Sequence, residues 1–141
     1  MSVEIVNFNF LAPIQVKMSD LDPFNHVNNG DQCHYFDYGR SCYFEHVLQQ
    51  KIDWLTFDLV LVHIDLDFHQ GIEFHDEIVC GTKVLEIGNK SFKMVQQLID
   101  KNTGKVKTTC HSVLCGFDRE NQSSIPIQEL YRKRLCNFEG L

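Results

Sequence analysis

Apolar and polar positions divide the chain into one long helical segment and a series of strands. From about Asn29 to Gln50 apolar residues recur at helical spacing without an intervening proline. They include Cys33, Phe36, Tyr43, Phe44, Val47 and Leu48. β-Branched and aromatic residues dominate from Ile5 to Met18, which predicts a strand bent or interrupted at Pro13. The pattern therefore predicts a strand, a polar connection and a single long helix.

Four strands are predicted between this helix and Asp118. LVLVHIDLDFHQ, residues 59–70, alternates between two faces. One face holds Val60, Val62, Ile64, Leu66 and Phe68, and the other holds Leu61, His63, Asp65, Asp67 and His69. EIVCGTKVLEI and SFKMVQQLID flank Gly88-Asn89, a pair that favours a tight type II′ hairpin, and KNTG leads into KVKTTCHSVLCGF. A polar loop, RENQSS, and a short helix within IPIQELYRKRL complete the chain.

This order of elements predicts an α+β fold in a single domain, residues 1–141. A chain of 141 residues with 43% hydrophobic residues is the size of one ordinary domain. One helix follows the first strand, and a long antiparallel meander is available to wrap around it. Because helix and sheet each have an apolar face, the sheet is expected to cover the helix so that both faces are buried.

Charge and composition restrict the partners and the compartment. The formal net charge of −6 repels polyanions, so no nucleic acid partner is expected. The first residues lack a basic and apolar export segment, and no window approaches the roughly 18 apolar residues of a membrane span. We therefore expect a cytoplasmic protein without membrane association. The six cysteines form no Cys-x-x-Cys pair and are expected to be free thiols.

Two polar groups invite a metal site, and neither fits one. Asp20-Leu21-Asp22 begins like a calcium loop, but Phe24 occupies a ligand position and Asn25 replaces the required glycine. The face with His63 and Asp65 separates alternate side chains by about 7 Å, so a shared ion needs ligands from another element. The chain also lacks serine-hydrolase, phosphate-loop and zinc-protease motifs. No metal and no resident cofactor is expected.

The segment SDLDPFNHVNNGDQ, residues 19–32, concentrates polar side chains ahead of the long helix. Asp-Pro favours turns and Asn side chains cap helices, so a capped loop is one interpretation. The segment holds more polar groups than one cap needs, and the start of a buried helix is expected deep in the domain. Such a start presents unpaired N–H groups and about half a positive charge, which suit a carbonyl oxygen that develops negative charge. An upstream carboxylate would lie near the carbonyl carbon.

These residues resemble the signature of hotdog-fold acyl-CoA thioesterases of the 4-hydroxybenzoyl-CoA type. Asp22, His26, Val27, Asn28 and Asn29 stand in the register of that signature, ahead of the stretch YFDYGR. LVLVHIDLDFHQGIEFHDEIVC and GNKSFKMVQQLIDKNTGKV resemble the family's second strand with its turn and its central hairpin. The resemblance covers nearly the whole chain.

The resemblance implies a hotdog domain, in which a curved antiparallel sheet wraps around the long helix, and a homodimer or homotetramer with active sites at the dimer interface. It implies that Asp22 is the catalytic carboxylate, as nucleophile or general base, and that the Asn29 N–H donates to the oxyanion. Plant acyl-carrier-protein thioesterases share the spacing to His26. That histidine is expected to hydrogen-bond Asp22 or the leaving thiol, or to brace the loop.

The remaining expected site residues concern substrate binding. Gln32 stands where the family usually has tyrosine, near the expected acyl pocket, and Asn28 is expected to support the loop or contact substrate. Lys90, Ser91 and Lys93, together with Arg119, are candidates for the coenzyme A phosphates. Coenzyme A enters as part of the substrate. Three alternatives stay open: an acyl carrier protein ester as substrate, a non-catalytic acyl-CoA-binding protein, and a hotdog dehydratase or hydratase.

Overall fold

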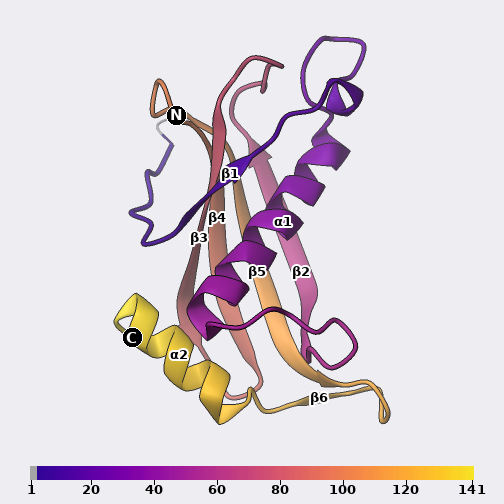
Figure 1. The fold of residues 1–141 in the computed structure, drawn as a ribbon, viewed down its shortest axis with the longest axis vertical. Helices are drawn as coiled ribbons and strands as arrows, with labels where there is room; N and C mark the ends of the chain where they lie inside the picture. The colour runs from indigo at the N-terminus through magenta and orange to yellow at the C-terminus, as the bar shows by residue number, and fades with distance from the viewer. Residues whose placement is uncertain (1–2) are drawn as a thin grey trace.

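In the computed structural model, which describes residues 3–141, one antiparallel sheet wraps around a long helix (Figure 1). The strands are β1 (Leu11–Ile14), β2 (Leu59–Phe68), β3 (Ile78–Ile87), β4 (Ser91–Asp100), β5 (Val106–Asp118) and β6 (Ser123–Ile125). Their order in the sheet is β1-β3-β4-β5-β2, and β6 pairs with β5. The helices are α1 (Asn29–Leu48) and α2 (Glu129–Glu139), with a short 3₁₀ helix, η1 (Met18–Asp20). The predicted α+β hotdog architecture is confirmed.

Helix α1 is the long helix that the apolar spacing predicts. Asn28 caps its start, because the Asn28 side-chain oxygen accepts a hydrogen bond from the Gly30 N–H at 2.7 Å. The helix ends two residues before the predicted Gln50, where Gln49 takes a left-handed conformation with a φ of 55°. No helix in the described part of the chain is both long and apolar enough to cross a membrane.

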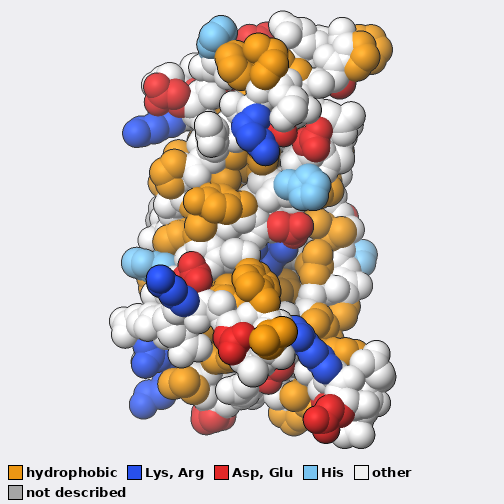
Figure 2. Space-filling model, turned by 45° about the vertical axis from the view of Figure 1, so that its right-hand side comes forward, with side chains coloured by type: hydrophobic (Ala, Val, Ile, Leu, Met, Phe, Trp, Pro, Cys, Tyr) orange, Lys and Arg blue, Asp and Glu red, His pale blue; other side chains and the backbone are white. Residues whose placement is uncertain are grey.

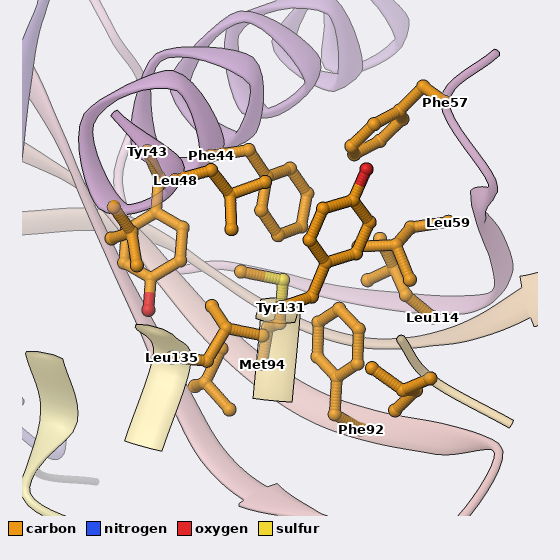
Figure 3. Packing of buried hydrophobic residues seen from close by; sticks show 13 residues of the cluster. Tyr43, Phe44, Leu48, Phe57, Leu59, Phe92, Met94, Leu114, Tyr131 and Leu135 are labelled. Atoms are coloured by element: carbon orange, nitrogen blue, oxygen red, sulfur yellow. The ribbon is translucent and has the colours of Figure 1, made fainter. Parts of the chain in front are cut away.

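Two apolar clusters fill the space between α1 and the sheet. Figure 3 shows the cluster around the C-terminal half of α1, where side chains from α1, β4, β5 and α2 converge. Its buried members include Tyr43, Phe44, Leu48, Phe92, Met94, Leu114, Tyr131 and Leu135. The second cluster surrounds the N-terminal half of α1 and includes Val27, Tyr35, Phe36, Ile72, Ile78, Leu98 and Cys110. The second cluster supports the end of the domain where the polar segment lies.

A layer of polar residues crosses the domain between these clusters. The Arg40 guanidinium donates from Nη2 to Gln96 Oε1 at 3.1 Å, and Arg40 is 6% exposed. Gln96 Nε2 donates in turn to the Phe36 carbonyl oxygen at 3.1 Å and to Thr82 Oγ1 at 3.0 Å. Arg40 Nη1 reaches Asp37 at the surface at 2.9 Å. Helix α1 is thereby tied to β3 and β4 by directional bonds as well as by apolar contact.

The first and last segments differ from the sequence prediction. The strand expected from Ile5 to Met18 is confined to Leu11–Ile14, with Pro13 in an edge strand, where its missing N–H is tolerated. The terminal helix begins at Glu129 because the preceding residues are extended, with Ser123–Ile125 paired to β5. The polar loop therefore contains a short strand that its composition does not indicate.

Two details of the central strands were also predicted wrongly. Gly88 does not have the positive φ that a type II′ turn requires. Three residues connect β3 and β4, and carbonyl groups of this turn accept hydrogen bonds from Gly116 and Ile127, which hold it open. In β2 a bulge between Leu61 and His63 resets the alternation. Leu61 therefore lies opposite Leu114 on the side that faces the helix, and not with His63 on the outer face.

We predict that Gly39→Ala destabilises the domain although alanine favours helix. A Cβ at Gly39 would lie 2.5 Å from Cys80 Sγ, where helix and sheet are in close contact. Overpacking of this kind costs about 1–3 kcal/mol of unfolding free energy. Urea unfolding of Gly39→Ala, Cys80→Ala and the double variant measures it. We expect the double variant to be more stable than the sum of the single effects predicts, and strict additivity would contradict the close contact.

Candidate active site

Asp22 lies in a short loop that its own carboxylate closes. Leu21 and Val27 form an isolated β-bridge, and the Asp22 N–H donates to the His26 carbonyl oxygen at 2.8 Å. Asp22 Oδ1 accepts the N–H groups of Phe24 at 2.9 Å and of His26 at 3.3 Å. Asn25, at the tip, has a φ of 64°, which asparagine tolerates well. One carboxylate oxygen is thus fixed by the loop, and Oδ2 accepts no hydrogen bond from the residues that the structure describes.

The start of α1 lies directly after this loop. The Asn29 N–H forms no hydrogen bond within residues 3–141, and Asn29 lines the same cavity as Asp22. The Asn28 side chain caps the helix, and the Asn28 backbone N–H donates to the Asp20 carbonyl oxygen at 2.8 Å. Asn28, Asn29 and Gly30 are exposed, so the expectation of a deeply placed helix start is wrong for the single chain. The sheet of the same chain therefore leaves the first residues of the helix uncovered.

His26 packs against the backbone of the segment that follows β2. A Cβ at Gly71 would lie 2.8 Å from His26 Nδ1, so only glycine leaves room for the ring at this distance. The Gly71 carbonyl oxygen accepts a hydrogen bond from Lys107 Nζ at 3.1 Å, and Lys107 also forms a largely buried ion pair with Asp76 at 3.4 Å. In this structure the backbone of His26, and not its ring, bonds Asp22.

A cavity of about 270 Å³ joins these groups. Its wall comprises the Asp22 loop, the first turn of α1 with Asn29 and Gln32, and the segment from Phe68 to Gly71. Gln32 is only 2% exposed, and its Oε1 accepts a hydrogen bond from the hydroxyl of Thr108 on β5. Asp22, His26, Asn29 and Gln32 therefore line one cavity.

A larger hollow of about 690 Å³ lies on the other side of the helix start and contains Asp20 and Tyr35. Asp20 Oδ2 accepts the Tyr35 hydroxyl at 2.6 Å and the Lys17 N–H at 3.0 Å. Burial raises the pKa of Asp20, but these hydrogen bonds outweigh burial and hold that pKa below its usual value. Burial and the bond to Asp20 raise the pKa of Tyr35. This carboxylate is committed to the fold and is not available for chemistry as Asp22 is.

The predicted coenzyme A contacts lie at the end of the domain opposite the start of α1. Lys90 belongs to the β3–β4 turn, which is bonded to residues beside β6 and α2, far from the start of α1 (Figure 1). Ser91 begins β4, and Lys93 forms a surface ion pair with Glu86 at 3.1 Å. The Arg119 guanidinium donates to the carbonyl oxygens of Leu55 and Phe57. Within one chain the structure does not bring these residues to the cavity.

The outer face of β2 and β5 carries the polar row that suggested metal. Asp65 lies 3.5 Å from His63 Nε2 and 3.8 Å from His111 Nδ1, and all three side chains are well exposed. Over residues 3–141, no group of three or more His, Cys, Asp or Glu residues is arranged to hold a metal ion. The six cysteines are free, and burial raises the pKa of the Cys80 and Cys110 thiols to about 12.

Comparison with known proteins assigns the family. Residues 16–135 match the family model described as the thioesterase-like superfamily. The chain belongs to this superfamily. A thioesterase from Thermus thermophilus, solved with coenzyme A and zinc, is 27% identical, with 95% of this chain and 97% of that chain covered and a TM-score of 0.82. The search of curated proteins found no significant match.

Two more distant structures share the fold of this thioesterase-like chain. A 1,4-dihydroxy-2-naphthoyl-CoA thioesterase from Synechocystis is 13% identical, with 91% of this chain and 96% of that chain covered and a TM-score of 0.82. A Staphylococcus aureus protein in complex with CoA is 12% identical, with 99% and 89% covered and a TM-score of 0.83. At these identities the similarity extends to the fold alone.

Part of the cavity wall in this thioesterase-like chain was missed from the sequence. Phe68 ends β2 and Gln70 and Gly71 follow it, and nothing in their local pattern separates them from an ordinary strand end. The backbone bond from the Val27 N–H to the Ile72 carbonyl oxygen at 2.8 Å and the contact of His26 with Gly71 join this segment to the Asp22 loop. Gly71 could have indicated this contact, since an isolated glycine at a strand often marks a site where another part of the chain approaches closely.

We predict that Tyr35→Phe lowers the unfolding free energy by about 1–2 kcal/mol at pH 7, because it removes the hydroxyl that Asp20 accepts. The folded-state pKa of Asp20 is lowered, so the stabilisation is present above its ordinary value of 3.8 and is lost as pH falls through the folded-state pKa. The difference between wild type and variant should therefore shrink below about pH 4. Urea unfolding at pH 7 and pH 3 tests this, with the exposed Tyr38→Phe as control. A difference independent of pH would contradict the role of Asp20.

Proposed function

We propose that this protein hydrolyses acyl-CoA thioesters to the free acid and coenzyme A. One observation carries the proposal: in a chain of the thioesterase-like superfamily, Asp22 and Asn29 line one cavity, and Asp22 Oδ2 and the Asn29 N–H form no hydrogen bond within residues 3–141. The solved relative from Thermus thermophilus is a thioesterase bound to coenzyme A, which supports the choice of ester. A carboxylate beside a helix N-terminus supplies the two things that thioester hydrolysis requires, a base or nucleophile and an oxyanion donor.

The thioester carbonyl oxygen accepts the Asn29 N–H and lies at the positive end of α1. As this oxygen becomes negative in the tetrahedral intermediate, the N–H bond and the helix dipole stabilise it more than they stabilise the ground state. The Asn28 side chain accepts the N–H of Gly30 and not that of Asn29, so the Asn29 N–H remains available. The cap thus orients the first turn without consuming the donor.

Asp22 acts on the carbonyl carbon by one of two routes. As a nucleophile, Oδ2 bonds to the carbon, the C–S bond breaks, the thiolate takes a proton, and water hydrolyses the resulting anhydride. As a general base, Asp22 takes a proton from a water that attacks the carbon, and the C–S bond then breaks to release the thiol. In both routes the bonds from Phe24 and His26 hold Oδ1 and leave Oδ2 directed at the substrate.

We predict that Asp22→Asn lowers kcat for acyl-CoA hydrolysis at least about a hundredfold. Asparagine keeps the Oδ1 acceptor, so the loop is retained while the reactive oxygen is lost. Release of thiol from a panel of aliphatic and aromatic acyl-CoAs measures the effect. The control is Asp53→Asn, because the Asp53 carboxylate also accepts a backbone N–H two residues on but lies in another loop. Full activity of Asp22→Asn, or an equal loss in Asp53→Asn, would exclude Asp22 as the reactive group.

Single-turnover hydrolysis in water enriched in oxygen-18 separates the two routes. The nucleophilic route requires that label enters the Asp22 carboxylate when water opens the anhydride at that side, whereas the general-base route leaves the enzyme unlabelled. Mass spectrometry of the peptide that contains Asp22 reads the result. Tight binding of acyl-CoA by the wild type without any thiol release would instead identify an acyl-CoA-binding protein.

We further propose that the protein is a homodimer joined along β2. Strand β2 has ten residues and an unpaired edge, and it exposes Leu61, Val62, Ile64 and Phe68 by 36–57%. Figure 2 shows hydrophobic side chains reaching the surface along the middle of the face turned forward from the β2 side. Such an edge is a template for pairing with another chain. The other edge, β1, has four residues and contains Pro13, which disfavours pairing.

Pairing of two β2 strands about a twofold axis reverses the long axis of the second copy. The β3–β4 turn of one copy then lies at the same end as the start of α1 of the other. This arrangement supports the predicted roles of Lys90, Ser91 and Lys93 in holding coenzyme A phosphates across the interface. It also covers the helix start that is exposed in the single chain.

We predict that Ile64→Lys converts the dimer to monomer and lowers thioesterase activity, because a buried unpaired ammonium is costly at a strand interface. Sedimentation velocity at micromolar concentration measures the mass. The matched control is Leu85→Lys on β3, which replaces a side chain of similar exposure away from the β2 edge, 42% against 36%, and should leave the dimer intact. A monomeric wild type, or an undisturbed dimer in Ile64→Lys, would exclude this interface.

A further inference from the structure

Gln32 is a buried amide in the wall of the candidate active site. It lies three residues beyond Asn29 on α1 and is 2% exposed, yet it faces the same cavity as Asp22. Buried amides normally use both their oxygen and their nitrogen, because an unpaired polar group away from water is destabilising. The partners of these two atoms therefore show whether Gln32 serves the fold alone.

The oxygen of Gln32 is bound and its nitrogen is not. The Thr108 hydroxyl, fully buried on β5, donates to Gln32 Oε1. In the planar amide this places Nε2 on the opposite side from Thr108. Nε2 forms no hydrogen bond with any residue between 3 and 141, and the cavity is the open space beside it. The site thus offers one directed N–H donor in addition to the Asn29 N–H.

The position along α1 indicates which part of a substrate this donor meets. Three residues of helix correspond to about 4.5 Å along the axis. A thioester carbonyl bound at Asn29 therefore directs its acyl group past Gln32, with Phe24 and Phe68 lining other parts of the cavity. An acyl group that extends along the helix in this way brings atoms two or three bonds beyond the thioester carbon to Gln32.

We propose that Gln32 is a specificity-determining residue that selects acyl groups with an acceptor oxygen two carbons beyond the thioester carbon. A hydroxyl or carbonyl on the third carbon of an aliphatic chain meets this requirement, as does an ortho hydroxyl on an aromatic ring. The inference rests on the proposed thioesterase function and adds the class of acyl group. An unsubstituted chain leaves Nε2 unpaired, and a site with an unpaired buried donor discriminates against such a ligand.

The test compares matched ester pairs: 3-hydroxybutyryl-CoA with butyryl-CoA, and 2-hydroxybenzoyl-CoA with benzoyl-CoA. We expect the wild type to prefer the oxygenated member of at least one pair by about tenfold or more in kcat/KM. Gln32→Met keeps the side-chain volume and removes the donor, so the ratio should fall towards one. The ratio of kcat/KM for the two esters, measured on one variant, does not depend on how much of that variant is folded, because both values scale with the same amount of active protein. Gln50→Met, at an exposed position beyond the other end of α1, should leave the ratio unchanged.

Binding separates failure of this inference from failure of the proposed function. Calorimetry on Asp22→Asn and on Asp22→Asn/Gln32→Met gives the affinity for each ester without turnover. Hydrolysis by the wild type with a ratio that Gln32→Met does not change overturns the role of Gln32 and leaves the thioesterase proposal standing. Absence of hydrolysis by the wild type overturns the thioesterase proposal, and the affinity ratio then decides the role of Gln32. Equal affinities within every pair would exclude it.

Discussion

A buried guanidinium fixes the position of the central helix on the sheet. Apolar clusters on either side of Arg40 would allow α1 to slide or rotate, since apolar contact is not directional. The bonds from Arg40 to Gln96, and from Gln96 to the helix backbone and Thr82, permit one register only. A buried charge in such a layer adds specificity more surely than it adds stability. The location of the first turn of α1, and hence of the whole cavity, follows from this layer.

The same organisation explains why the candidate site is open in a single chain. The sheet covers α1 along most of its length, but the helix start extends beyond that cover and Asn28 to Gly30 are exposed. The cavity is completed by the segment after β2, which is held to the Asp22 loop through Val27. An edge strand with exposed apolar side chains lies next to this end of the molecule. Site and proposed interface are therefore continuous, and one depends on the other.

The sequence predicted the order of the main elements because α1 is a long segment without proline and the central strands are rich in apolar residues between turns. It failed where tertiary bonds override local preference: carbonyl acceptors hold the Gly88 turn open, and pairing to β5 makes Ser123–Ile125 a strand. The bulge in β2 could not be predicted from the sequence, because one extra residue in a strand leaves its composition unchanged. In the site, Asp22 and Asn29 were named from the resemblance of residues 19–32 to a family signature, and their roles stay predictions. Gly71 and the partner of Gln32 were not predicted, because they come from segments distant in the sequence that are joined only in the folded chain.

The Asp22 loop is self-contained, and this has a consequence for how the protein can diverge. Its geometry depends on a β-bridge and on backbone donors within five residues of Asp22, and not on the side chains that line the rest of the cavity. Substitutions at positions such as 24, 32 or 68 can therefore reshape the cavity while the Asp22 carboxylate keeps its place. Under the proposed function, hydrolysis and selectivity are separable traits, so substitutions in the cavity wall can change the preferred substrate while hydrolysis is retained.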